Sequence, residues 1–99
     1  MITMLVTYAG DDATRFKRDH WITVHFPLVR ECWEPYGLVS AAGFFPQGDG
    51  GGLIAVGVVT FRDEAAMEAA LASPETARIM ADVDLVTDVK PQRSVVQSL

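Results

Sequence analysis

The chain has few of the residues that define several common functional classes. Its single cysteine, Cys32, excludes an internal disulfide, and with no second thiol it offers neither a redox pair nor a cysteine-based zinc cluster. Basic residues are scarce, because 8 lysines and arginines stand against 13 aspartates and glutamates, which gives a net charge of -5. Such a chain has no basic stripe to neutralise phosphates, so we expect neither nucleic acid nor an anionic membrane surface as a partner.

Long hydrophobic runs are also missing. No run approaches the roughly 18 apolar residues that a membrane-spanning helix needs, and the opening MITMLVTYAGDD lacks the basic start of a signal peptide. We therefore expect a cytoplasmic protein. The length of 99 residues, with 49% hydrophobic and 21% charged residues, predicts one folded domain over residues 1–99 with a small core.

The hydrophobic pattern predicts six elements. Residues 2–8, ITMLVTY, alternate between two faces as a half-buried strand does. A helix is expected to begin after Asp12, which suits an N-cap, and to stop at Gly37. The later elements are strands over residues 38–45 and 53–61, helices over 64–72 and 75–85 with caps at Asp63 and at Ser73-Pro74, and an edge strand within 89–97 that begins near Pro91.

This order, βαββαβ, is typical of the ferredoxin-like α+β fold, an antiparallel sheet with both helices on one face. The third predicted strand, LIAVGVVTF, is apolar on both faces, with Val59 and Phe61 on one side and Val56 and Val58 on the other. Two helices cover only one side of a sheet. The pattern therefore predicts a homodimer in which two sheets face each other.

Both histidines lie in the predicted first helix, at His20 and His25. On an α-helix they are roughly 140° apart, so they do not share a face, which argues against a zinc pair. Pro27 removes one amide donor and crowds the carbonyl of Thr23, which predicts a kink beside His25. The freed carbonyl could bond His25, or the ring could turn into a cavity that the kink opens.

A series of short motifs runs through nearly the whole chain. They are Phe16, His20-Trp21, His25-x-Pro27-Leu28-Val29, Trp33-x-Pro35-x-Gly37-Leu38, the segment VTFRDEAAMEAAL, Asp82, Thr87-Asp88-Val89 and Pro91. In their order and spacing they resemble the EthD family, named for a protein associated with bacterial degradation of ethyl tert-butyl ether. His20 stands where that family usually has an aromatic residue, often tyrosine, and residues 84–86, DLV, replace its common Pro-Asn-aromatic.

The resemblance implies a dimeric α+β barrel, and similar barrels include isomerases, cyclases and monooxygenases that act on small aromatic or lactone-like molecules. We expect His25 to donate or accept a proton, because an imidazole has both forms accessible near neutral pH. No cofactor is needed for such chemistry. The predicted pocket lies between the sheet and the first helix and is lined by Trp21, Leu28, Val56 and Val58, with Tyr8 able to donate its hydroxyl to the ligand.

Two other interpretations fit the same residues. The chain could be a non-catalytic homodimer that binds a hydrophobic ligand or supports a partner protein. Alternatively the interior is closed, with Trp21, Phe26 and Met80 filling the space and His25 bonded to a backbone carbonyl as a structural residue.

Overall fold

A four-stranded antiparallel sheet forms one layer of the molecule. The computed structural model describes residues 1–48, 50–97 and 99. The strand order is β2-β3-β1-β4, so the strands that are second and third in the chain pair with each other at one side of the sheet. The strands are β1 (Ile2–Ala9), β2 (Leu38–Phe44), β3 (Leu53–Phe61) and β4 (Gln92–Val96).

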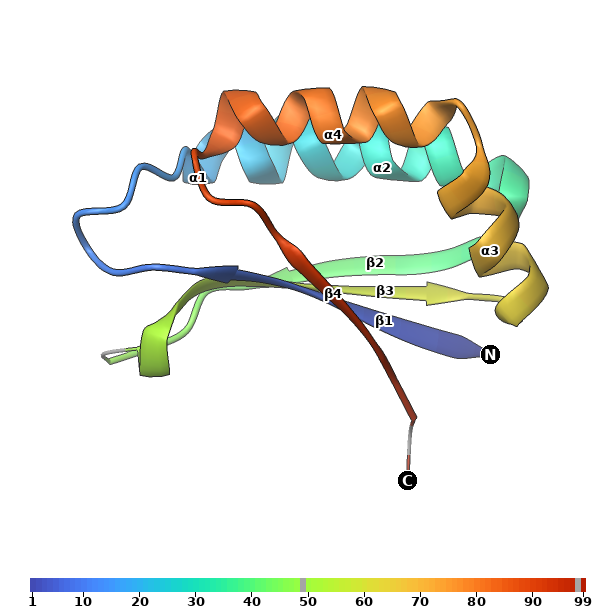
Figure 1. Cartoon of the computed structure of the whole chain (residues 1–99), viewed down its shortest axis with the longest axis horizontal. Helices are drawn as coiled ribbons and strands as arrows, with labels where there is room; N and C mark the ends of the chain where they lie inside the picture. Colours follow the sequence, from blue (N-terminus) through green and yellow to red (C-terminus); the bar gives the residue numbers. More distant parts are fainter. Residues whose placement is uncertain (49, 98) are drawn as a thin grey trace.

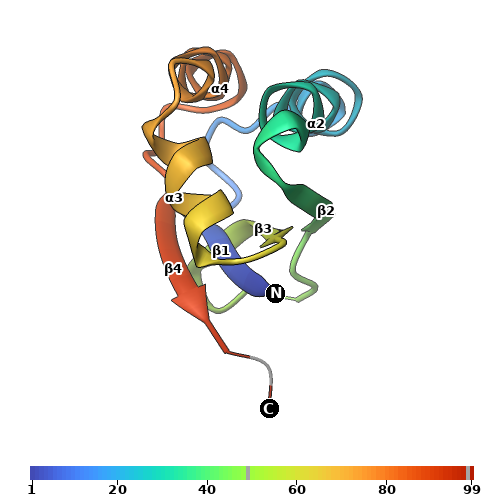
Figure 2. The same cartoon turned by 90° about the vertical axis from the view of Figure 1, so that its right-hand side faces the viewer.

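The helices form the second layer and cover one face of the sheet (Figure 1). The first long helix consists of α1, a π-helical turn and α2 in continuous succession, and it runs beside α4 in the opposite direction (Figures 1 and 2). This is the ferredoxin-like α+β architecture, as predicted. The bounds are α1 (Arg18–His20), the π-helical turn (Trp21–His25), α2 (Phe26–Trp33), α3 (Glu64–Ala72) and α4 (Glu75–Val86), with 3-10 turns at Glu34–Tyr36 and Gly50–Gly52.

The predicted caps of the later helices fare differently. Asp63 caps α3 as expected, because its carboxylate accepts the backbone N–H of Ala66 at 2.7 Å. The prediction that Ser73 caps α4 is wrong. The Ser73 hydroxyl instead donates to the carbonyl of Ala70 at 2.6 Å, so it completes the end of α3, and Pro74 takes the N-cap position of α4.

The first helix begins later than predicted, and Asp12 does not cap it. Its N-cap is Lys17. The backbone is held away from helical geometry just before this point, because Phe16 forms a β-bridge with Thr87 and the Lys17 N–H donates to the carbonyl of Val86 at 2.9 Å. These contacts join the start of the first helix to the end of α4, across some seventy residues that a local sequence pattern does not span.

Gly37 ends the first helical stretch, as predicted. Its φ of 105° lies in the left-handed region that favours glycine. A Cβ at this position would also lie 2.7 Å from the Cβ of Ala66 on α3. Gly37 therefore permits both the turn into β2 and the close approach of α3.

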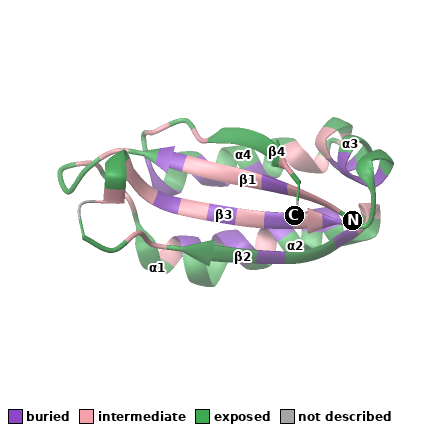
Figure 3. Cartoon of the chain, turned by 90° about the horizontal axis from the view of Figure 1, so that it is seen from below, coloured by how far each residue is buried: buried purple, intermediate pink, exposed green. Residues whose placement is uncertain are grey.

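The face of the sheet opposite the helices carries no charged residue in the described strands, and it mixes apolar side chains with threonine, serine and glutamine. Along β3, buried residues alternate with half-buried ones, and Figure 3 shows this alternation from the side that the helices leave open. We call this surface the open face. The strand register places on it Thr3, Leu5, Thr7, Ser40, Ala42, Phe44, Val56, Val58, Thr60, Gln92, Ser94 and Val96.

The described helices are all too short or too polar to cross a membrane.

Candidate functional site

One buried carboxylate holds both histidines of the chain. Asp82, on α4, lies 2.8 Å through its Oδ2 from Nδ1 of His25 and 2.9 Å through its Oδ1 from Nε2 of His20. The side chains of Asp82 and His25 are 9% and 6% exposed, whereas that of His20 is 26% exposed. The cluster therefore runs from the interior at His25 to the surface at His20.

A π-helical turn brings the two histidines to the same side of the helix. The expectation that they diverge by roughly 140° assumed an α-helix and is wrong. Residues Trp21–His25 form a π-helical turn, in which a backbone N–H bonds the carbonyl five residues earlier rather than four. The N–H of Phe26 accordingly donates to the carbonyl of Trp21. A wider turn takes more residues to complete, so positions five apart come round to nearly the same face.

Pro27 explains why the helix widens here. Without an N–H it cannot bond the carbonyl four residues earlier, and its ring would crowd that carbonyl in a regular α-helix. A π-helical turn just before the proline relieves both problems. The predicted irregularity beside His25 is therefore present, but the freed space turns the ring toward Asp82 rather than toward a backbone carbonyl.

The hydrogen bonds fix the role of each nitrogen of His25. A carboxylate can only accept, so Nδ1 of His25 carries the proton that it donates to Asp82. In the neutral ring Nε2 then has a free lone pair. Among the described residues no donor or acceptor pairs with Nε2, and no buried polar side-chain atom of the structure lacks a partner, so this nitrogen has access to open space. His25 is arranged as a base.

Burial and hydrogen bonding set the charge states. Burial lowers the pKa of His25, and the opposing pull of the Asp82 carboxylate does not cancel this effect. Burial alone would raise the pKa of Asp82, but the hydrogen bonds from His20 and His25 outweigh it and hold the pKa below its usual value. The pair at neutral pH is thus a neutral imidazole on an ionised carboxylate.

These shifts predict that the fold loses stability on mild acidification. Because the pKa of His25 is lower in the folded chain, the unfolded chain binds the proton first, so stability falls as pH drops below about 6.5. The depressed pKa of Asp82 adds a second loss only below about pH 4. Urea unfolding at half-unit steps from pH 7.5 to 5 measures the first loss.

The matched variant is His25→Gln, which keeps a donor for Asp82 and removes the titrating ring. Its free energy of unfolding should change less than that of the wild type between pH 6.5 and pH 5. A flat wild-type profile over this range would contradict a buried neutral His25.

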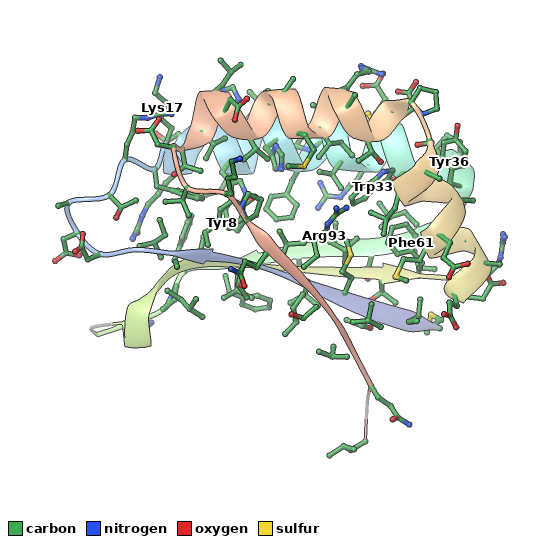
Figure 4. All side chains as sticks on the ribbon, viewed as in Figure 1. Tyr8, Lys17, Trp33, Tyr36, Phe61 and Arg93 are labelled. Carbon is green, nitrogen blue, oxygen red and sulfur yellow. The ribbon has the colours of Figure 1, made fainter. Side chains whose placement is uncertain are left out.

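His25 lines a cavity of about 100 Å³ between the sheet and the helices. Figure 4 shows Tyr8, Trp33 and Arg93 on the helix-covered side of the sheet, from three different elements. Burial raises the pKa of Tyr8, so its hydroxyl stays protonated as a donor. The lining is Val6, Tyr8, Trp21, His25, Phe26, Val29, Trp33, Gly57, Val59, Ile79, Met80, Val83, Pro91 and Arg93.

Aromatic rings give the cavity flat, rigid walls. Trp21 meets Tyr8 and Phe26 edge to face, with centroids 5.9 and 4.7 Å apart. Gly43 on β2 makes room for them, because a Cβ there would lie 2.7 Å from the Phe26 ring and 2.9 Å from that of Trp21. The walls suit a flat, apolar ligand.

The predicted site residues separate into two groups. Tyr8, Trp21 and His25 line the cavity together. Val56 and Val58 do not, because their partners on β1 are Thr7 and Leu5, on the open face. The predicted pocket lined by these valines is therefore corrected: side chains alternate along β3, and Gly57 and Val59 face the cavity instead.

Leu28 also lies outside the cavity lining, although it packs against the core. Trp21, Phe26 and Met80, which fill this space in the closed-interior alternative, all line the cavity.

Sequence reasoning missed the part played by Asp82 and Arg93. Asp82 was noted only as part of the family pattern, although a signal exists: it occupies the buried stripe of α4, between Ile79 and Val86, where an acid needs a partner. Arg93 lies opposite Val6 in the sheet, on the face toward the helices. No sequence pattern links either residue to His25.

The fold has known counterparts among solved structures. An EthD-like protein from Ralstonia eutropha JMP134 is 18% identical, with a TM-score of 0.83 over 97% of this chain and 89% of that one. A protein of the ethyl tert-butyl ether degradation (EthD) family from Bacillus halodurans C-125 is 14% identical, with a TM-score of 0.74 over 100% of both chains. This chain has the EthD-like fold.

The EthD-like fold is shared with an oxygenase. SnoaB from Streptomyces nogalater, a cofactor-independent oxygenase, is 11% identical, with a TM-score of 0.71 over 98% of this chain and 91% of that one. No protein-family model and no curated protein matches the sequence. At these identities the comparison establishes the EthD-like architecture, and the chemistry has to be argued from the residues.

Proposed function

We propose that the chain is a cofactor-independent enzyme that acts on a small hydrophobic or aromatic molecule, with His25 as the proton acceptor. One observation carries the proposal: Nδ1 of His25 is bonded to a buried carboxylate at 2.8 Å while Nε2 is unpaired beside an aromatic-walled cavity. A base oriented by a third group is the arrangement that proton-transfer enzymes use.

The proposed chemistry follows from which atoms of His25 and Asp82 carry protons. Nε2 of His25 takes a proton from an acidic carbon or a phenol of the ligand, and Asp82 stabilises the imidazolium that forms. Returning the proton to another atom gives isomerisation, and attack of the carbanion within the same molecule gives cyclisation. Reaction of that anion with molecular oxygen would place one oxygen atom in the ligand and release the other as water, with the ligand itself supplying the electrons. SnoaB, which has a similar fold, is a cofactor-independent oxygenase.

The second proposal is that two copies associate through the open face. None of the strand residues that the register places there carries a charge, and Val58 and Phe44 lie among them, with Phe44 56% exposed. Leu5 and Val56 extend the apolar part of this face, and exposed apolar patches of this kind are typical of protein–protein contacts. A homodimer with face-to-face sheets covers this face, and leaves each cavity within its own chain.

An alternative is a non-catalytic binding or accessory module in which His25 is structural. The size of the cavity favours it, because about 100 Å³ is below the 300 Å³ or more of ordinary ligand pockets. The two functions differ in whether His25 removes a proton or merely completes a hydrogen-bond network.

The test needs no knowledge of the product. A thermal-shift screen against small phenols, quinones and lactones identifies a ligand, which is then incubated with the protein in D₂O and followed by ¹H NMR. The wild type should accelerate deuterium incorporation at the acidic C–H of the ligand by 100-fold or more over buffer, the usual contribution of a positioned base.

His25→Gln is the informative variant, since it keeps a donor for Asp82 but cannot accept the proton. It should still bind the ligand and lose the exchange. Binding by both proteins with no exchange by either would assign the chain to the binding-module alternative.

A further inference from the structure

Arg93 is the one residue with a fixed charge among those that line the cavity. It comes from β4, where its register partner is Val6, so it lies on the same face of the sheet as Tyr8 and on the opposite side of the cavity from the helices. The rest of the lining is apolar or aromatic apart from Tyr8 and His25. Arg93 is itself exposed, so its charge lies where the cavity meets solvent.

The guanidinium of Arg93 has no partner within the described part of the chain, which distinguishes it from the other arginines. In a protein with 13 acidic residues an arginine readily finds a carboxylate. Each of the others has a contact: Arg15 with Asp88, Arg62 with Asp63, Arg78 with Glu75, Arg30 with the carbonyl of Ala41, and Arg18 with the ring of Phe45.

We infer that Arg93 forms an anion subsite at the rim of the cavity, so that the ligand is a small hydrophobic carboxylate whose apolar ring enters between the aromatic walls. Arginine pairs with carboxylates through two parallel N–H···O bonds, which fixes the orientation of the anion. The inference rests on the proposed function in so far as the bound ring would then be presented to His25.

The net charge of -5 strengthens the argument that Arg93 marks a binding site for anions. Most of the surface repels organic anions at long range, so an anion binds where a cation is free of acidic partners. A 150 Å³ cavity binds benzene, so a cavity of about 100 Å³ has room for at most one ring, and the carboxylate therefore lies outside it, at the rim.

The test compares isosteric probes that differ only in charge. Benzoate and benzamide, and phenylacetate and phenylacetamide, are titrated by NMR chemical shift against the wild type, Arg93→Gln and Arg93→Lys. The wild type should bind each carboxylate at least 10-fold more tightly than its amide. Arg93→Gln should lose this preference while keeping its affinity for the amides, and Arg93→Lys should keep part of it.

Arg62→Gln is the matched control, because it makes the same change of charge at an exposed arginine outside the cavity lining. It should retain the preference. Equal wild-type affinity for carboxylate and amide, no binding of the carboxylates at millimolar concentration, or equal loss in Arg62→Gln and Arg93→Gln would overturn the inference.

The deuterium-exchange assay separates the subsite from the proposed function. If the wild type catalyses exchange on an uncharged ligand and His25→Gln does not, while the wild type shows no preference for carboxylates, only the subsite is wrong. If the preference holds but His25→Gln exchanges as fast as the wild type, the subsite is right and the role of His25 is wrong.

Discussion

Replacing Asp82 with asparagine is expected to lower the free energy of unfolding by about 3 kcal/mol. The carboxylate accepts one N–H from each histidine, through Oδ1 and Oδ2. An asparagine keeps one acceptor and presents an NH₂ group where the second was, so one histidine must flip, change tautomer or lose its partner in a buried position. Urea denaturation of both proteins at pH 7.5 gives the difference.

Asp84→Asn on the same helix is the control, since Asp84 is exposed and its side chain forms no hydrogen bond in the described structure. It should change stability by less than about 0.5 kcal/mol. An effect of Asp82→Asn as small as that of Asp84→Asn would mean that the cluster does not stabilise the fold.

The second large effect is expected at the open face. Val58→Lys should convert a dimeric wild type into a monomer at micromolar concentrations, because symmetric association would bury two unpaired ammonium groups between the sheets. Val58 points away from the helices, so the fold of the single chain is retained. Light scattering coupled to size exclusion reads the mass, and circular dichroism verifies the fold.

Val24→Lys is matched to this substitution, because Val24 is exposed on the helix layer rather than on the open face. It should leave the dimer intact. A monomeric wild type would refute association through the open face, as would a dimer that survives Val58→Lys but dissociates in Val24→Lys.

Local signals predicted much of the fold. The bounds of β3 and α3 match the predicted residues 53–61 and 64–72, because glycines and the Asp63 cap mark both within a few positions. The start of the first helix was wrong because Phe16 and Lys17 are held by the far end of α4. Secondary-structure propensity depends on neighbours in the sequence, so it does not predict contacts between distant residues.

The candidate site depended on contacts of longer range. The prediction of a pocket with Tyr8, Trp21 and His25 between the sheet and the first helix came from the resemblance to the EthD family, and the three residues do line one cavity. Asp82 is separated from His25 by 57 positions, so only the packing of α4 against the first helix brings it there. The valines at 56 and 58 were misplaced because a strand that is apolar on both faces does not reveal which face a cavity adjoins.

The π-helical turn divides the first helix into two segments with different neighbours. The segment after the turn, α2, packs against both β2 and α4. The segment before it is fastened to α4 at two points, through the bond from the Lys17 N–H to the Val86 carbonyl and through the bond from His20 to Asp82. A one-residue insertion between Lys17 and His20 would therefore put these two bonds out of register with each other, while His25 lies beyond the insertion and keeps its neighbours.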